Sequence, residues 1–144
     1  MRRWILAAGL IPAGGMALAH AGVENPAVKA RMDAMSDIGA GTKVLGNMAR
    51  GRVAFDAAEA EAEAALARIA TRAAETPALF EAQEDDPKSE ALPAIWADFA
   101  DFSAIAGDLR RAAEGGDVSS LDALRATIQQ VDATCQACHS VYRE

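Results

Sequence analysis

The chain has 144 residues, 51% of them hydrophobic by type, and its 14 basic and 21 acidic residues give a formal net charge of −7. That length suits one small domain. Aromatic residues make up only 5% of the chain, which disfavours a β-sandwich, and the negative charge disfavours nucleic-acid binding through a basic field. Two cysteines and two histidines are too few for a disulfide-rich scaffold or a module with two zinc sites.

The N-terminus has the pattern of a secretory signal peptide. Two arginines after the first methionine precede an apolar stretch over residues 4–18, and Ala-His-Ala at residues 19–21 matches an Ala-x-Ala cleavage site. The apolar stretch is shorter than the roughly 20 residues that a spanning helix needs. We therefore expect residues 1–21 to be removed in the periplasm, leaving residues 22–144 as one soluble domain without a membrane anchor.

Cleavage would change two counts that bear on the chemistry. It removes two basic residues and no acid, so the net charge becomes −9. A charge of this sign favours redox partner proteins with basic docking surfaces and disfavours anionic membranes. Cleavage also removes His20, which leaves His139 as the only histidine of the mature chain.

Apolar residues with helical spacing predict four amphipathic helices, at residues 26–50, 54–75, 93–114 and 119–142. Asn25 is a candidate N-cap of the first helix, with Pro26 at the first helical position, and Asp117 or Ser119 can cap the fourth. Residues 76–92 contain two prolines and an acidic run, which indicates a long crossover loop. Helices of this kind bury their apolar stripes against one another, so we expect an all-α, antiparallel four-helix bundle with a cofactor in its core.

The motif that decides the chemistry is Cys135-Gln136-Ala137-Cys138-His139, near the end of the fourth helix. In covalent haem attachment each thiol adds across a haem vinyl group to form a thioether, and the adjacent imidazole becomes an axial iron ligand. At about 100° per residue, the two cysteines and the histidine share one helix face, which is also the apolar face. One haem c, held by two thioethers inside the bundle, is therefore expected.

Two cysteines three residues apart have other possible interpretations: a buried pair or disulfide, a thioredoxin-like redox pair, and half of a zinc site. A redox pair usually begins a helix that follows a strand, and no strand is expected here. Zinc would need a fourth ligand from a carboxylate or water. The export signal and the histidine that follows the second cysteine favour haem over these alternatives.

The export signal, the four helices and a haem motif at the extreme C-terminus resemble the class II c-type cytochromes, the cytochrome c′ family, over essentially the whole mature chain. The resemblance also rests on Arg31-x-x-x-Met35 with Gly39, on Ala94-Ile95-Trp96, and on Tyr142-Arg143 after the haem motif. It implies that Cys135 and Cys138 form the thioethers, that His139 is the proximal ligand, and that Arg31 lies near the haem propionates.

The resemblance also implies that Met35 faces the distal side of the iron. In five-coordinate members a bulky apolar residue at that position, sometimes an unbound methionine, covers an iron that binds small gases such as nitric oxide or carbon monoxide. In low-spin members the residue is a methionine bound to the iron, and the protein transfers electrons. We expect Met35 to be a ligand and the protein to be an electron carrier rather than an enzyme, with gas binding as the alternative. The family often forms homodimers, and the sequence leaves this open.

Three further features of the helical wheel bear on the site. Gly39 and Gly46 share the face of Met35 and would each weaken a helix by about 1 kcal/mol, which indicates either a flat group such as a haem or a close helix crossing. Met32 is a weaker candidate ligand than Met35, and Met48 is expected to be ordinary packing. Trp96 lies about 100° from the centre of its helix's apolar stripe, which is typical of a residue at the haem edge or of a partly exposed packing residue.

Overall fold

The structure is a computed structural model that describes residues 22–144, so the expected signal peptide at residues 1–21 lies outside the described part. The four long helices are α1 (Pro26–Ala49), α2 (Glu59–Leu79), α4 (Phe99–Glu114) and α5 (Leu121–Tyr142). Two short elements precede α2 and α4, namely the 3-10 turn η1 (Phe55–Ala57) and the helix α3 (Ala94–Ala97).

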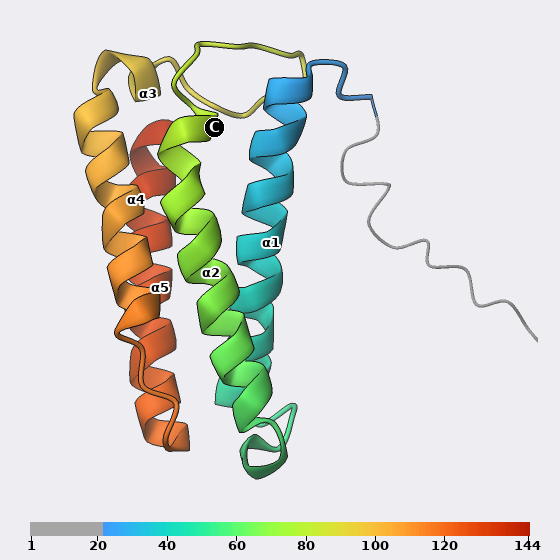
Figure 1. The fold of residues 1–144 in the computed structure, drawn as a ribbon, viewed down its shortest axis with the longest axis vertical. Coiled ribbons are helices and arrows are strands. Elements are labelled where there is room, and N and C mark those ends of the chain that lie inside the picture. Colours follow the sequence, from blue (N-terminus) through green and yellow to red (C-terminus); the bar gives the residue numbers. More distant parts are fainter. Residues whose placement is uncertain (1–21) are drawn as a thin grey trace, which may run out of the picture.

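The four long helices form an antiparallel bundle (Figure 1). Helix α1 packs against α2 and α5, and α4 packs against the same two helices from the other side. Short connections join α1 to α2 and α4 to α5 at one end, whereas the long crossover from α2 to α3 passes over the other end, beside the start of α1 (Figure 1). The expected all-α four-helix bundle is thereby confirmed.

The apolar side chains form two buried clusters along the bundle. The larger one contains the fully buried side chains Leu45, Met48, Ile69, Leu124 and Val131. The smaller one consists of Phe80, Ile95, Phe102 and Tyr142. Cys135 packs against the larger cluster and Cys138 against the smaller one, so the cysteine motif of α5 lies where the two clusters meet.

Helix α1 begins as the sequence predicts. The side chain of Asn25 accepts hydrogen bonds from the N–H groups of Ala27 and Val28, at 2.8 and 3.2 Å, and Pro26 occupies the first turn. The N-cap of α5 was placed wrongly, because the hydroxyl of Ser120 accepts from the N–H of Ala123 at 3.1 Å. A side-chain acceptor of this kind satisfies one of the free N–H groups at a helix start.

Helices two and three differ from the expected ranges. Helix α2 begins only at Glu59 and continues through Pro77 to Leu79. The third helix, expected to be continuous, is divided at Asp98, whose backbone leaves the helical region at φ −135° and ψ 63°. The carboxylate of Asp98 accepts from the N–H of Asp101 at 3.2 Å, so α4 starts from a cap of its own and α3 points in a different direction.

Helices α1 and α2 cross closely at Gly41. A Cβ at this position would lie 2.8 Å from Cγ1 of Ile69 and 3.1 Å from the carbonyl oxygen of Ala65. Because Ile69 is fully buried, we expect Gly41→Ala to lower the free energy of unfolding by roughly 1–3 kcal/mol in urea titrations. The matched control is Gly107→Ala in α4, where a Cβ meets only the guanidinium end of the exposed Arg111 side chain and better helix propensity adds about 1 kcal/mol. Equal effects of the two substitutions would contradict the close crossing.

Candidate haem-binding site

A cleft of about 580 Å³ opens between α1 and α5, on the side where the crossover lies. Its lining brings together the sequence-predicted residues Arg31, Met32, Met35, Cys135, Cys138 and His139. Between them lies a largely apolar floor that includes Val28, Ile38, Phe80, Ile105 and Leu109. Residues more than one hundred positions apart in the chain therefore meet at one apolar cleft of the size range of small-molecule sites.

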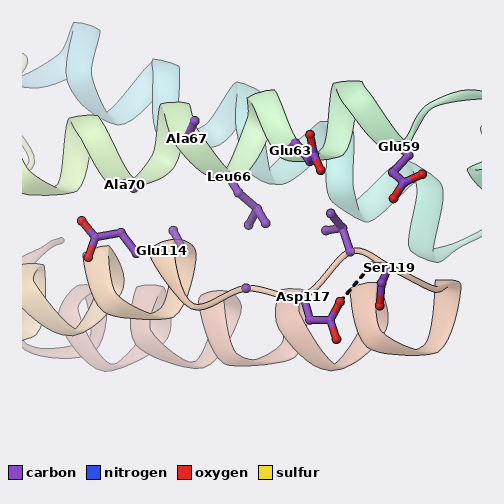
Figure 2. A pocket seen from close by; sticks show the side chains of 11 residues that line it. Glu59, Glu63, Leu66, Ala67, Ala70, Glu114, Asp117 and Ser119 are labelled. Carbon is purple, nitrogen blue, oxygen red and sulfur yellow. Dashed lines mark hydrogen bonds between the residues drawn. The ribbon is translucent and has the colours of Figure 1, made fainter.

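A second cleft, of about 540 Å³, lies between α2 and the connection from α4 to α5 (Figure 2). Its carboxylates are Glu59, Glu63, Glu114 and Asp117, and the dashed line in Figure 2 joins Asp117 to Ser119, whose N–H donates to it at 2.8 Å. The lining of this second cleft contains neither a cysteine, a histidine nor a methionine. Of these two clefts, only the first offers donors for a haem iron.

The two cysteines of α5 are half-buried free thiols. Burial raises the pKa of Cys135, and it raises the pKa of Cys138 to about 11, with nearby negative charge adding to both shifts. Both side chains are therefore protonated at neutral pH in the chain before haem attachment. Net addition of such an S–H group across a vinyl double bond gives a thioether.

The imidazole of His139 follows directly after the second cysteine and stays accessible from the cleft. Partial burial lowers the pKa of His139, and the positive charge of Arg143 lowers it further. The ring is therefore neutral at physiological pH. A neutral imidazole nitrogen is the form that binds a metal, so His139 can bind iron without first losing a proton.

The opposite wall of the cleft comes from α1. Met35 is 36% exposed although it is a large apolar residue, and Met32 lines the same cleft. Gly39 borders the cleft too, with no heavy atom within 4 Å of the position of a Cβ. Gly46 does not border it and instead lies against the guanidinium of Arg50, so only one of the two glycines leaves room for a flat group.

Met48, by contrast, is buried in the larger cluster, with 1% of its surface exposed. It is absent from the lining of the cleft. The expectation that this residue is ordinary packing is confirmed, which leaves Met32 and Met35 as the methionines of the site.

Arg31 is 3% exposed and lies at the crossover end of the cleft. Its guanidinium donates to three backbone carbonyls, from Nε to Leu79 at 2.9 Å, from Nη2 to Ala82 at 2.6 Å and from Nη1 to Glu84 at 2.9 Å. Burial lowers the pKa of Arg31 and the charge of Glu84 opposes this, but an arginine stays charged at any physiological pH. These carbonyl contacts were not foreseen from the sequence, and they leave two of the five N–H groups of the guanidinium for other partners.

Trp96 packs beside this arginine and is not part of the cleft lining. The guanidinium carbon of Arg31 lies 5.4 Å from the Trp96 ring and 4.7 Å from the Phe80 ring. The indole Nε1 of Trp96 donates to the carbonyl oxygen of Phe80 at 2.8 Å. The structure thus places Trp96 outside the cleft wall, and its expected position at the haem edge stays a prediction.

Tyr142, the only tyrosine of the sequence, is buried in the smaller cluster and lines the cleft. Its hydroxyl donates to Oδ2 of Asp101 at 2.6 Å, and this bond, followed by burial, raises the pKa of Tyr142 to about 12. The unfolded value is about 10, so the stabilisation is complete below about pH 10 and is lost as the pH rises through 12.

The pH dependence of the stabilisation by the Tyr142 hydroxyl can be tested by comparing wild type with Tyr142→Phe, which removes the hydroxyl. We expect wild type to be the more stable protein in urea titrations at neutral pH. Its advantage should shrink between about pH 10 and pH 12, as the phenol loses its proton in the native state. An advantage that stays constant over this range would contradict the role of the hydrogen bond to Asp101.

The donors of the cleft fit a covalent haem. Two thiols and a neutral imidazole project from adjacent turns of α5, beside an apolar floor, and a thioether sulfur lies on the opposite wall. These are the protein groups that a c-type haem uses for attachment and axial ligation. Bundle cores are common places for such sites.

Comparison with known proteins decides the family. A family model described as cytochrome C′ matches residues 26–143. The chain belongs to the cytochrome c′ family. It is 30% identical to cytochrome c-556 of Rhodopseudomonas palustris, over 94% of this chain and 95% of that one.

Solved structures of cytochromes support the same assignment. Cytochrome c′ from Rhodopseudomonas palustris is 30% identical, with a TM-score of 0.76 over 84% of this chain and 98% of that one. A nitric oxide complex of a cytochrome c prime variant from Alcaligenes xylosoxidans is 30% identical, with a TM-score of 0.63 over 82% and 94% of the two chains. Membership of the cytochrome c′ family confirms the expected bundle and the expected haem c. Within the described residues, no helix of this cytochrome combines the length and apolar character needed to cross a bilayer.

Proposed function

We propose that this cytochrome carries single electrons through a haem c attached to Cys135 and Cys138, with His139 and Met35 as the axial ligands. The observation that supports the proposal is that His139 of α5 and Met35 of α1 line the same largely apolar cleft. His139 is the only histidine among the described residues. The second axial ligand of a six-coordinate iron is therefore not another of the described histidines, and Met35 of α1 is the exposed methionine of the cleft.

When bound, the haem supplies an iron that takes up one electron from a donor and passes it to an acceptor. The neutral imidazole of His139 binds without a proton change, and a thioether ligand raises the potential relative to a second imidazole. The apolar floor of the cleft keeps water from the cofactor, which also raises the potential. No substrate is bound and no covalent bond is made in the transfer, so the protein is proposed to be a carrier rather than an enzyme.

The proposal includes export to the periplasm. The supporting feature is the signal pattern at residues 1–21, with cleavage after Ala21. The mature protein is then one domain, residues 22–144, whose net charge of −9 suits redox partners with basic docking surfaces. N-terminal sequencing of the protein recovered from the periplasm tests this part, and a start at residue 22 is expected.

A second candidate function is the binding of nitric oxide or carbon monoxide at an open distal site. It is favoured by the exposure of Met35 and by the empty space at Gly39, one turn further along α1. The similarity to a cytochrome c prime variant whose structure is a nitric oxide complex points the same way. In this case Met35 would cover the iron without binding it, and an incoming gas would displace only its side chain.

The spin state of the iron separates the two candidates. The protein matured with haem in the periplasm should give the electron paramagnetic resonance spectrum of low-spin ferric iron and bind carbon monoxide slowly. High-spin iron that binds carbon monoxide readily would contradict the electron carrier and support gas binding. A pyridine haemochrome assay on the same sample measures the covalent haem content, which must be one per chain in either case.

A further inference from the structure

The crossover, residues 80–93, is tied to α1 at two places. Arg31 of α1 donates to the carbonyls of residues 79, 82 and 84, and its guanidinium stacks on Phe80 at the start of the crossover. Asp86, only 5% exposed, accepts hydrogen bonds from the N–H groups of Glu24 and Asn25, at 2.9 and 3.0 Å, just before α1 begins. The first half of the crossover is therefore anchored to α1 and to the residues just before it.

The second half of the crossover is tied to the end of α5. The N–H of Leu92 donates to the carbonyl of Tyr142, and the N–H of Glu144 donates to the carbonyl of Glu90, both at 3.0 Å. The side chains of Glu90 and Arg143 also form an ion pair at 2.5 Å. Paired backbone groups of this kind hold two segments in register, as in a sheet.

These ties lie close to both candidate axial ligands. Arg31 precedes Met35 by four residues, about one turn of α1, and Tyr142 follows His139 by three residues on α5. The cleft opens between the two helices at this level. The crossover thus joins the wall that carries Met35 to the wall that carries His139.

We propose that residues 80–93 form a strap that fixes the spacing of α1 and α5, and that Arg31 is the positioning residue that controls how readily a distal ligand reaches the iron. The inference rests on the proposed function in so far as it places the iron at His139. A coordinate bond is short and directional, so displacement of a side chain by about 1 Å changes the outcome strongly. Lysine cannot reproduce the planar fork of arginine, because its three N–H groups leave a single nitrogen whereas the bonds of Arg31 leave Nε, Nη1 and Nη2.

The test compares Arg31→Lys with Arg72→Lys in the haem-loaded protein. Arg72 is a matched control, since it also makes several polar contacts, to Asp37 at 2.6 Å and Glu75 at 2.7 Å, but lies outside the cleft lining and the strap. We expect Arg31→Lys to raise the rate of carbon monoxide binding by about tenfold or more and to increase the high-spin fraction. Amide hydrogen exchange at Leu92 and Glu144 should also become faster, whereas Arg72→Lys should change none of these.

A folded Arg31→Lys protein that binds carbon monoxide at the wild-type rate would overturn the proposal that residues 80–93 act as a strap. If this variant does not fold, Trp96→Phe and Glu90→Gln take its place, because they remove the bond from Nε1 to Phe80 and the ion pair to Arg143. A faster rate in either supports the strap, and wild-type rates in both overturn it.

Failure of the proposed function gives a different result. In that case the iron of the wild-type protein is already high-spin, and Met35→Ala does not change its spin state. The comparison of carbon monoxide binding rates between Arg31→Lys and Arg72→Lys still tests the strap in that case. With no distal ligand to displace, the binding rate depends directly on the spacing of α1 and α5.

Discussion

Met35→Ala is expected to convert the low-spin iron to a high-spin, five-coordinate state. The substitution removes a thioether sulfur from the cleft that His139 also lines, and the methyl group of alanine offers the iron no ligand. The reduction potential should fall by on the order of 0.1 V, because axial ligands set haem potentials over a range of about 0.8 V. Carbon monoxide should bind to the reduced protein at least an order of magnitude faster, since it no longer competes with a bound thioether.

The matched control for this substitution is Met32→Ala. Met32 lies on the same helix and lines the same cleft, but it is more buried than Met35 and lies nearly one turn closer to the start of α1. We expect its spectrum to stay low-spin and its potential to change little. A low-spin spectrum that survives Met35→Ala and disappears in Met32→Ala would identify Met32 as the ligand and contradict the assignment made here.

Features set by neighbouring residues could be predicted from the sequence. The cap at Asn25 requires only the two N–H groups that follow it. The shared face of Cys135, Cys138 and His139 follows from helical geometry, and the structure does place all three at one cleft. Each of these depends on residues within about one turn, where the spacing of side chains is fixed by the backbone alone.

Features set by distant residues could not be predicted. The expected end of α2 at residue 75 ignored Arg31, which lies 48 positions before Leu79 and bonds to its carbonyl. That contact satisfies a group at the C-terminal end of the helix, where a cation is also favoured by the helix dipole. The pairing of residues 90–92 with residues 142–144 is likewise invisible in the sequence.

The helix that carries Trp96 illustrates a third way in which the structure differs from the expected ranges. The position of Trp96 on the helical wheel assumed one continuous helix over residues 93–114. Because the backbone breaks at Asp98, angles measured from the apolar stripe of α4 do not apply to α3. A signal for the break was present, since Asp98 precedes Asp101 by the spacing at which a side chain can cap a new helix.

Replacing both cysteines, as Cys135→Ser with Cys138→Ser, is expected to abolish covalent haem. Without a thioether, His139 and Met35 hold the cofactor only by mass action, which stabilises a protein by about 4 kcal/mol even at a thousand times the dissociation constant. The haem should therefore be lost on acid extraction, and the thermal midpoint should fall because the apolar floor of the cleft becomes exposed to water.

Haem staining of the denatured double variant measures the loss of haem, and calorimetry measures the fall in the thermal midpoint. Ser140→Ala, adjacent to the motif but outside the cleft lining, should match wild type in both. Haem that stays attached to the double variant would show that the bond to the protein lies elsewhere.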